Sequence, residues 1–350
     1  GELVPILEEL SDDEADAKLA EELSVRAAQF LSGPLQAPER AIETWKRILE
    51  RFGPSARTLA ELETLLAAHG TPEALAQVLE LQGTHAQDET KVTALLKLAR
   101  LSLRTLEDDL RAEGAYRAAL ECDLTFTTRS ELEGMLAQSD HRYLAARVLE
   151  PYYRHAENPT ALLHALRIRA QDAASDDLRI SAIDEGLALL RQGAPQEEGR
   201  DDELTFLALR LRIAALQRNP AEMTTWQRQL ETALAERQVP PDVRARALTD
   251  ALPLLSTLHP SSASLVLSAA SAFEECSDFG EAARLLRALL PIQREIEHLE
   301  PHLLTRIDNL LKMHGGVPER VAVFREALER ETDATKQQVL FRTIAQIEHG

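Results

Sequence analysis

Two histidines, His298 and His302, come nearest in this sequence to a metal-binding motif. Imidazoles four residues apart on an unbroken helix lie on the same side and can hold one zinc ion. Pro301 stands between them and ends or kinks a helix, and Glu300 is not where the zinc-protease motif places its carboxylate. We therefore expect a loop between two helices here and predict no metal site.

Other catalytic patterns are missing from the sequence. It contains no glycine-rich phosphate loop and no Gly-x-Ser-x-Gly nucleophile turn. Adjacent acids such as Asp108 and Asp109 are more often helix caps or solvated surface than an acid–base pair. Cys122 and Cys276 are isolated, so they form neither a disulfide framework nor a zinc site. We predict no catalytic residue and no cofactor, and we expect that the chain is not an enzyme.

Basic residues recur at a regular interval. Arg26, Lys97 and Arg167 are 71 and 70 residues apart. Two further cations, Arg100 and Arg104, share the helical face of Lys97. If successive repeats stack, these five side chains form a basic stripe that attracts an acidic peptide or a C-terminal carboxylate, and we take them as candidate partner-binding residues. The alternative is that each pairs with Asp or Glu of a neighbouring helix, as most surface charges do.

The elements that must position these residues are amphipathic helices. Apolar residues recur three or four positions apart in almost every segment, as in Val92, Leu96 and Ala99. Lys97 falls on the opposite, polar flank of that segment. Leu, Ala, Glu, Arg and Gln dominate the composition and are strong helix formers, whereas aromatic residues make up only 4 %. The sequence therefore predicts an all-α chain.

Helix starts are marked by a capping residue followed by proline. Thr71, Asn158 and Asn219 each precede a proline. The side-chain oxygen of such a residue accepts a hydrogen bond from an otherwise unpaired backbone N–H, and proline at the first helical position loses no hydrogen bond. These marks predict helices of roughly 12 to 18 residues joined by connections of about two to six.

The helical segments repeat along the chain. Residues 41–50 and 112–121 share a leading alanine, a central aromatic residue and a Leu-Glu end at a shift of 71, and 182–191 keep the opening. Matches between 62–66 and 132–136, and between 78–80 and 148–150, have a shift of 70. Four helices in each period predict an α-solenoid of antiparallel helix hairpins, in which stacking buries the apolar faces. The alternative is chance similarity between Leu- and Ala-rich helices.

Within the repeats, Ala112, Tyr116 and Ala119 are spaced four and three residues apart, and Ala41 and Trp45 reproduce the first two positions. This spacing resembles the second helix of tetratricopeptide repeats. Most units lack the small residue that the family carries on its first helix and unit lengths drift, so the resemblance is to a divergent array over most of residues 12–348. It implies a superhelix whose concave groove binds peptides or protein surfaces.

We expect the aromatic residues at this repeat position to pack in the core and not to form a stacking platform: Trp45, Tyr116 and Phe324.

A stretch without a large apolar residue interrupts the array at 193–203. Its glycine, proline and acidic residues are typical of a solvated loop or linker. We place a domain boundary there, with N-terminal helical repeats over 1–192 and C-terminal helical repeats over 204–350. The alternative is a long loop within one continuous array, because repeat proteins tolerate insertions in their loops.

The net charge of −19 and a pI near 5.0 restrict the partners. Such an acidic surface repels nucleic acid and anionic membranes, and no apolar run approaches the roughly 20 residues of a membrane span.

Two isolated cysteines fit a reducing compartment, so we expect a cytoplasmic protein, and the excess of Arg over Lys suggests a bacterial one. The chain begins with Gly1 and has no signal-peptide pattern there, so we expect a fragment or a processed form.

An elongated array without visible chemistry points to a protein-interaction scaffold or adaptor that binds a peptide or protein through its groove, and the basic stripe would make an acidic partner the preferred one. The alternative is the regulatory or substrate-positioning arm of a larger multidomain enzyme whose catalytic domain lies outside this sequence. An RNA-binding helical repeat is a third possibility, which the negative charge disfavours.

Overall fold

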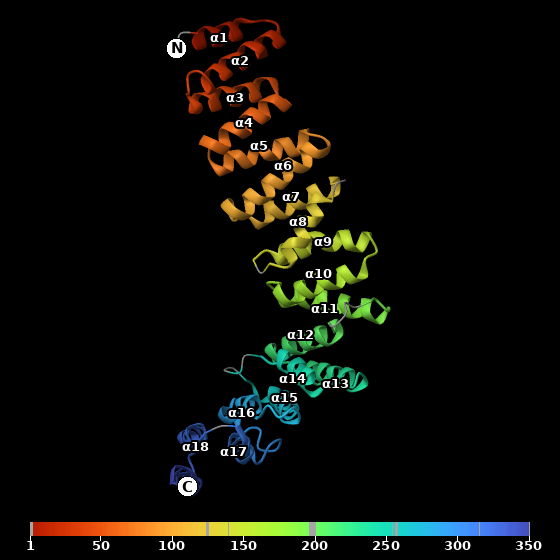
Figure 1. Cartoon of the computed structure of the whole chain (residues 1–350), viewed down its shortest axis with the longest axis vertical. Helices are drawn as coiled ribbons and strands as arrows, with labels where there is room; N and C mark the ends of the chain where they lie inside the picture. The colour runs from red at the N-terminus through yellow and green to blue at the C-terminus, as the bar shows by residue number, and fades with distance from the viewer. Residues whose placement is uncertain are drawn as a thin grey trace. The chain divides into compact units, whose positions relative to one another are not determined.

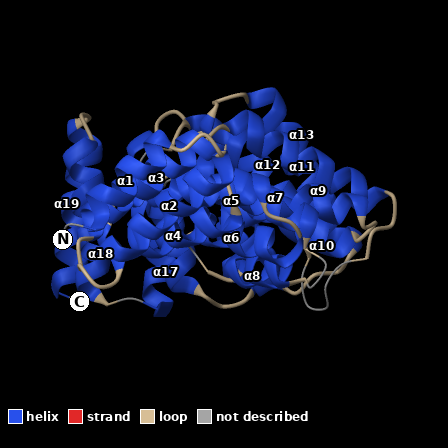
Figure 2. Cartoon of the chain, turned by 90° about the horizontal axis from the view of Figure 1, so that it is seen from above, coloured by secondary structure: helices blue, strands red, loops and turns tan. Residues whose placement is uncertain are grey.

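The computed structural model describes residues 3–123, 126–138, 140–195, 201–253, 255, 258–314 and 316–349. Within these residues every regular element is a helix, and Figure 2 shows helices joined by loops with no strand. The chain forms two compact units, Gly1–Ala156 and Glu157–Gly350. Inside each unit most helices pack against the next one along the chain, across short connections that reverse its direction. The prediction of an all-α solenoid of antiparallel helix hairpins is therefore confirmed.

The first unit is a series of helices that follow one another in chain order (Figure 1). Helix α6 ends in a short π-helical turn, η1, which adds a residue to the turn and redirects the chain toward α7. The elements of this unit are α1 (Leu3–Asp13), α2 (Ala17–Ser32), α3 (Pro38–Phe52), α4 (Ala56–His69), α5 (Pro72–His85), α6 (Asp88–Leu101), η1 (Ser102–Leu106), α7 (Asp109–Cys122), α8 (Thr127–Leu136) and α9 (Arg142–His155).

The predicted helix starts are confirmed. Thr71 precedes α5 and its hydroxyl oxygen accepts a hydrogen bond from the Ala74 N–H at 3.3 Å, with proline in the first turn. Asn158 and Asn219 cap two helices of the second unit in the same way. Each cap pairs a backbone donor that the helix cannot satisfy itself, so the sequence fixes where these helices begin.

The core of the first unit lies between consecutive helices. Trp45 of α3 is fully buried in a cluster that includes Val25 of α2 and Leu62 of α4. Tyr116 of α7 is buried at the repeat-equivalent position, as is Phe324 in the second unit. The expectation that these aromatic residues pack in the core is confirmed. Large side chains at this position fill the space between neighbouring helices, which accounts for their recurrence.

The second unit continues with helix pairs of the same kind. Phe206 of α12 is fully buried and its ring lies close to Gly186 of α11, where a Cβ atom would come within 2.5 Å of the ring. The elements of this unit are α10 (Pro159–Asp172), α11 (Asp176–Arg191), α12 (Asp202–Leu216), α13 (Pro220–Glu236), α14 (Pro241–Asp250), η3 (Pro260–Ser262), α15 (Ala263–Glu275), α16 (Phe279–Arg287), η4 (Leu290–Ile292), α17 (Leu303–His314), α18 (Val317–Arg330) and α19 (Ala334–His349).

Two predicted loops have different outcomes. His298 and His302 lie in a segment of turns that ends where α17 begins at Leu303, so the expected break in the helix is confirmed. The predicted linker at 193–203 includes 196–200, which lie outside the described residues, and α12 already begins at Asp202. The division of the chain at this linker stays a prediction, whereas the compact units adjoin in sequence between Ala156 and Glu157.

Candidate functional site

A cavity of 400 Å³ opens among α4, α5 and α6 of the first unit, and we call it the α4–α6 groove. Its apolar wall includes Leu59 of α4 and Ala94 of α6, and its polar lining includes Glu63, Gln82 and Lys97. The α6 residues lie there because the helix turns its buried stripe toward α5 and α7, which leaves the flank with Lys97 beside α4. The groove therefore combines an apolar wall with charged and amide groups.

Lys97 reaches across the groove to an acidic residue of α4. Its Nζ lies 2.5 Å from Glu63 Oε1, and the side-chain amide of Gln82 donates to Glu63 Oε2 at 2.9 Å. About half of the Lys97 side chain is exposed, against 22 % of Glu63. A half-exposed ion pair contributes at most about 1 kcal/mol to stability, so little energy holds Lys97 to this one partner.

Arg100 forms a second link, from α6 to α8. Its Nε and Nη2 donate to the two carboxylate oxygens of Glu131 at 2.9 and 2.6 Å, and the Tyr116 hydroxyl donates to Glu131 Oε1 at 2.9 Å. Burial alone raises the pKa of the Glu131 carboxyl, but the hydrogen bonds from Arg100 and Tyr116 outweigh it and hold that pKa below its usual value. Burial, together with the same hydrogen bond, raises the pKa of Tyr116. Arg104 follows on η1 and is exposed.

The other two candidate residues lie elsewhere. Arg26 is on α2 and pairs at 3.0 Å with Glu22 of its own helix. Arg167 belongs to α10 of the second unit and pairs at 2.8 Å with Asp202, where only 14 % of the Arg167 side chain is exposed. The structure thus brings Lys97, Arg100 and Arg104 together on one helix and its π-helical extension, and places Arg26 and Arg167 on other helices. The binding role of all five stays a prediction.

The carboxylates beside these cations were not identified from the sequence. Glu63 lies 34 residues before Lys97, and Glu131 lies 31 residues after Arg100. Both separations are close to the length of one helix hairpin, so the acids belong to the helices two places away along the chain. Opposite charges separated by one hairpin length are a sequence signal for such pairs, because stacked hairpins bring these positions together, but many positions share that spacing and it does not single out these two.

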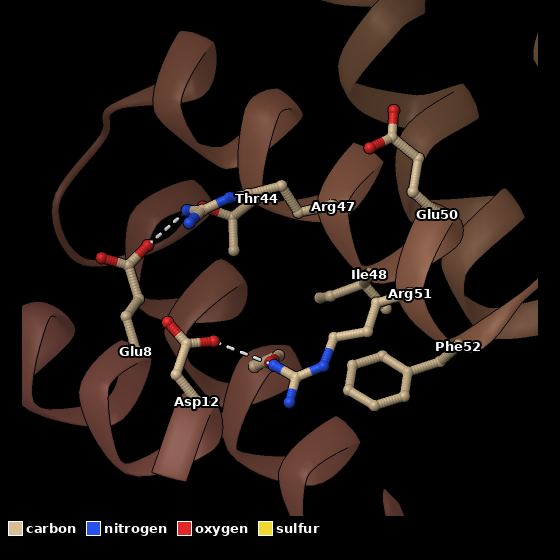
Figure 3. A pocket seen from close by; sticks show the side chains of 9 residues that line it. Glu8, Asp12, Thr44, Arg47, Ile48, Glu50, Arg51 and Phe52 are labelled. Atoms are coloured by element: carbon tan, nitrogen blue, oxygen red, sulfur yellow. Dashed lines mark hydrogen bonds and ion pairs between the residues drawn. The ribbon is translucent and has the colours of Figure 1, made fainter.

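A second cavity, of 340 Å³, lies between α1 and α3, and we call it the α1–α3 cavity (Figure 3). Arg47 and Arg51 of α3 extend toward Glu8 and Asp12 of α1, and the dashed lines in the figure mark the two ion pairs. The Phe52 ring lies under the Arg51 guanidinium, whose Cζ is 5.0 Å from the ring centroid. No described residue lines both this cavity and the α4–α6 groove.

Among the residues placed by the structure, no group of three or more His, Cys, Asp or Glu side chains is arranged to hold a metal ion. No described helix is both long and apolar enough to cross a bilayer.

Comparison with known proteins assigns no family. No family model matches the chain, and no curated protein matches it. Among solved structures, the chain is similar to a "circular tandem repeat protein with novel repeat topology and enhanced subunit contact surfaces". The identity is 17 % over 99 % of this chain and 82 % of that chain, with a TM-score of 0.20.

Proposed function

We propose that this chain is a protein-interaction scaffold, a divergent tetratricopeptide-like array, that binds a peptide or protein segment in the α4–α6 groove. The observation that carries the proposal is a 400 Å³ groove that has apolar walls and an exchangeable cation, Lys97, at its edge. Grooves of this kind take an extended segment by burying apolar side chains while polar groups fix its orientation.

Lys97 offers an acidic side chain of the partner a cation in the groove, beside the carboxylates Glu63 and Glu89. A carboxylate of the partner would pair with Lys97 at little cost, because the existing ion pair is half-exposed. Glu63 would keep its hydrogen bond from Gln82 and would offer its freed oxygen to a backbone N–H of the bound segment. Arg104, exposed on η1, extends the positive charge beyond the groove. The groove thus supplies a cation for the partner's acidic side chain and an acceptor for its backbone.

The test is a selection of random peptides of about twelve residues against the purified chain, followed by fluorescence polarisation with the selected peptides. Selected peptides should carry at least one acidic residue, and Lys97→Glu should weaken their binding tenfold or more. Lys18→Glu, which makes the same charge change at an exposed site on α2, should leave binding within twofold.

Two results would contradict the proposal. One is a selection that yields no peptide bound by the chain. The other is an affinity that falls equally in Lys97→Glu and Lys18→Glu, which would trace the effect to net charge and not to the groove. The bacterial origin, the cytoplasmic location and the absence of catalysis stay predictions.

A further inference from the structure

The two ion pairs at the α1–α3 cavity match in spacing. Glu8 and Asp12 are four residues apart on α1, and Arg47 and Arg51 are four residues apart on α3, so each pair lies on one side of its helix. Arg47 Nη2 lies 2.6 Å from Glu8 Oε1, and Arg51 Nη1 lies 2.9 Å from Asp12 Oδ1. The arginine face of α3 is therefore complementary to a helix that carries carboxylates at positions i and i+4.

Apolar contacts hold α1 mainly against α2, in a small cluster around Val4. Of its eleven residues, only Val4 and Ser11 are buried. The larger apolar side chains Leu3, Ile6 and Leu10 are each about half exposed. Burial of apolar area is the main force that fixes a helix on its neighbours, and because α1 buries little of it, polar contacts also contribute to its placement.

Most of these polar contacts are made near the end of α1. The buried Ser11 hydroxyl donates to the Ala20 carbonyl oxygen at 2.8 Å and lies 2.6 Å from the Ser24 hydroxyl oxygen. Arg51 Nη2 donates to the Ser11 carbonyl oxygen at 3.2 Å in addition to pairing with Asp12. The two ion pairs are exposed at Arg47 and Asp12, where water and salt weaken them.

The space under the ion pairs is not filled by α1. The cavity of 340 Å³ is walled by Ile48 and Phe52 of α3 and by Ser24 of α2. This cavity is open to solvent, so its apolar lining is only partly covered, and a larger apolar side chain of a docked helix would make contacts there. A helix with the same carboxylate spacing and a bulkier apolar side chain between them would fit this face better than α1 does.

We propose that the α3 face with Arg47 and Arg51 is a docking surface for an acidic amphipathic helix, and that α1 occupies it within the same molecule. The partner is a helix with carboxylates at i and i+4 that displaces α1. Release of α1 opens the arginine face and the cavity beneath it together. This surface is separate from the α4–α6 groove, so the proposal does not rest on the proposed function.

The test uses the full chain and a fluorescein-labelled peptide with the sequence of residues 3–16 as the probe. Wild-type protein should bind it weakly, because α1 competes from an effective concentration on the order of millimolar. The double variant Glu8→Lys, Asp12→Lys places lysines opposite the arginines, so that α1 is repelled from α3. This protein should bind the peptide at least tenfold more tightly than wild type. The control, Glu9→Lys with Asp13→Lys, makes the same charge change at exposed positions of α1 and should bind like wild type.

Two companion measurements separate release of α1 from damage to the fold. Hydrogen exchange of the α1 amides should accelerate in the Glu8→Lys, Asp12→Lys protein and not in the control, while α4 to α9 keep their protection. Adding Arg47→Glu and Arg51→Glu to that protein should abolish peptide binding and should return α1 to wild-type protection, because the charges are then exchanged between the two helices.

Each remaining outcome overturns the proposal. If α1 exchanges faster but the peptide binds no more tightly than to wild type, the α3 face is not a docking surface. If exchange of α1 is unchanged in the Glu8→Lys, Asp12→Lys protein, the ion pairs do not hold α1 in place. If the fourfold variant still binds the peptide, the arginines do not form the site.

Discussion

Glu131 joins three helices of the first unit, and its replacement by glutamine tests the described geometry most directly. The carboxylate of α8 accepts two hydrogen bonds from Arg100 of α6 and one from Tyr116 of α7. Glu131→Gln keeps the shape and one acceptor oxygen but removes the charge. The three donor groups then compete for a single neutral oxygen, and at least one of them is left with water or with nothing.

The expected loss of stability in Glu131→Gln follows from the surroundings of each donor. A hydrogen bond to a charged group contributes about 1.5–3 kcal/mol, and this range applies to Tyr116, which is buried. Half of the Arg100 side chain is exposed, so solvent screening limits its pair to less than about 1 kcal/mol. The remaining acceptor oxygen of glutamine recovers part of the free energy of these hydrogen bonds. We expect a net loss of about 1–2 kcal/mol in the free energy of local unfolding.

Native-state hydrogen exchange is the suitable assay, because a repeat array unfolds in parts and one global midpoint is poorly defined. A loss of this size lowers protection of the α7 and α8 amides by roughly 5- to 30-fold. Glu121→Gln, at an exposed position near the end of α7, is the matched control and should change protection less than twofold.

The effect should also depend on pH. The pKa of Glu131 is lower in the folded chain than its usual 4.5, so the carboxylate stabilises the fold above that value. This stabilisation is lost as the pH falls through the folded pKa, where wild-type Glu131 becomes neutral. The difference between wild type and Glu131→Gln should be complete at neutral pH and should shrink in acid. A difference that is constant down to about pH 3, or below about 0.5 kcal/mol throughout, would refute the reasoning.

Three substitutions test the packing and the caps. Gly114→Ala places a methyl group where no atom lies within 4 Å and should raise stability by about 1 kcal/mol through helix propensity, seen as a higher melting temperature. Gly186→Ala makes the same change in α11, but the new methyl group meets the buried Phe206 ring, so overpacking should exceed the gain and lower stability by about 1 kcal/mol. Asn219→Ala removes the acceptor for the Glu222 N–H and should cost about 1 kcal/mol, measured as faster exchange in the first turn of α13. Equal melting shifts for the two glycine variants would contradict the close packing at Phe206.

Local features of the fold could be predicted from the sequence, and contacts between helices two places apart could not. Thr71 marks a helix start because its hydroxyl bonds a backbone N–H three residues away, and Trp45 is buried because its position repeats on an apolar face. The partner of Lys97 depends instead on how α4 and α6 are rotated about their axes with α5 packed between them.

The predicted linker illustrates the same limit. The sequence predicts a solvated loop at 193–203, which includes Asp201 and Asp202. In the structure Asp201 caps α12 by accepting from the Leu204 N–H, and Asp202 is buried beside Arg167. An acidic pair at the end of a polar stretch is compatible with both situations, and only the packing of α10 against α12 decides between them.

The ion pairs of the first unit carry a consequence for its cooperativity. Lys97 and Glu63 connect α6 with α4, and the Arg111 to Glu80 pair at 3.0 Å connects α7 with α5. The energetics of solenoids are described by coupling between adjacent repeats, and these ion pairs belong to that coupling because each joins one helix hairpin to the next. Added salt weakens this electrostatic part, while the apolar contacts between adjacent helices persist. Ionic strength would therefore set how many helices open together when the array frays.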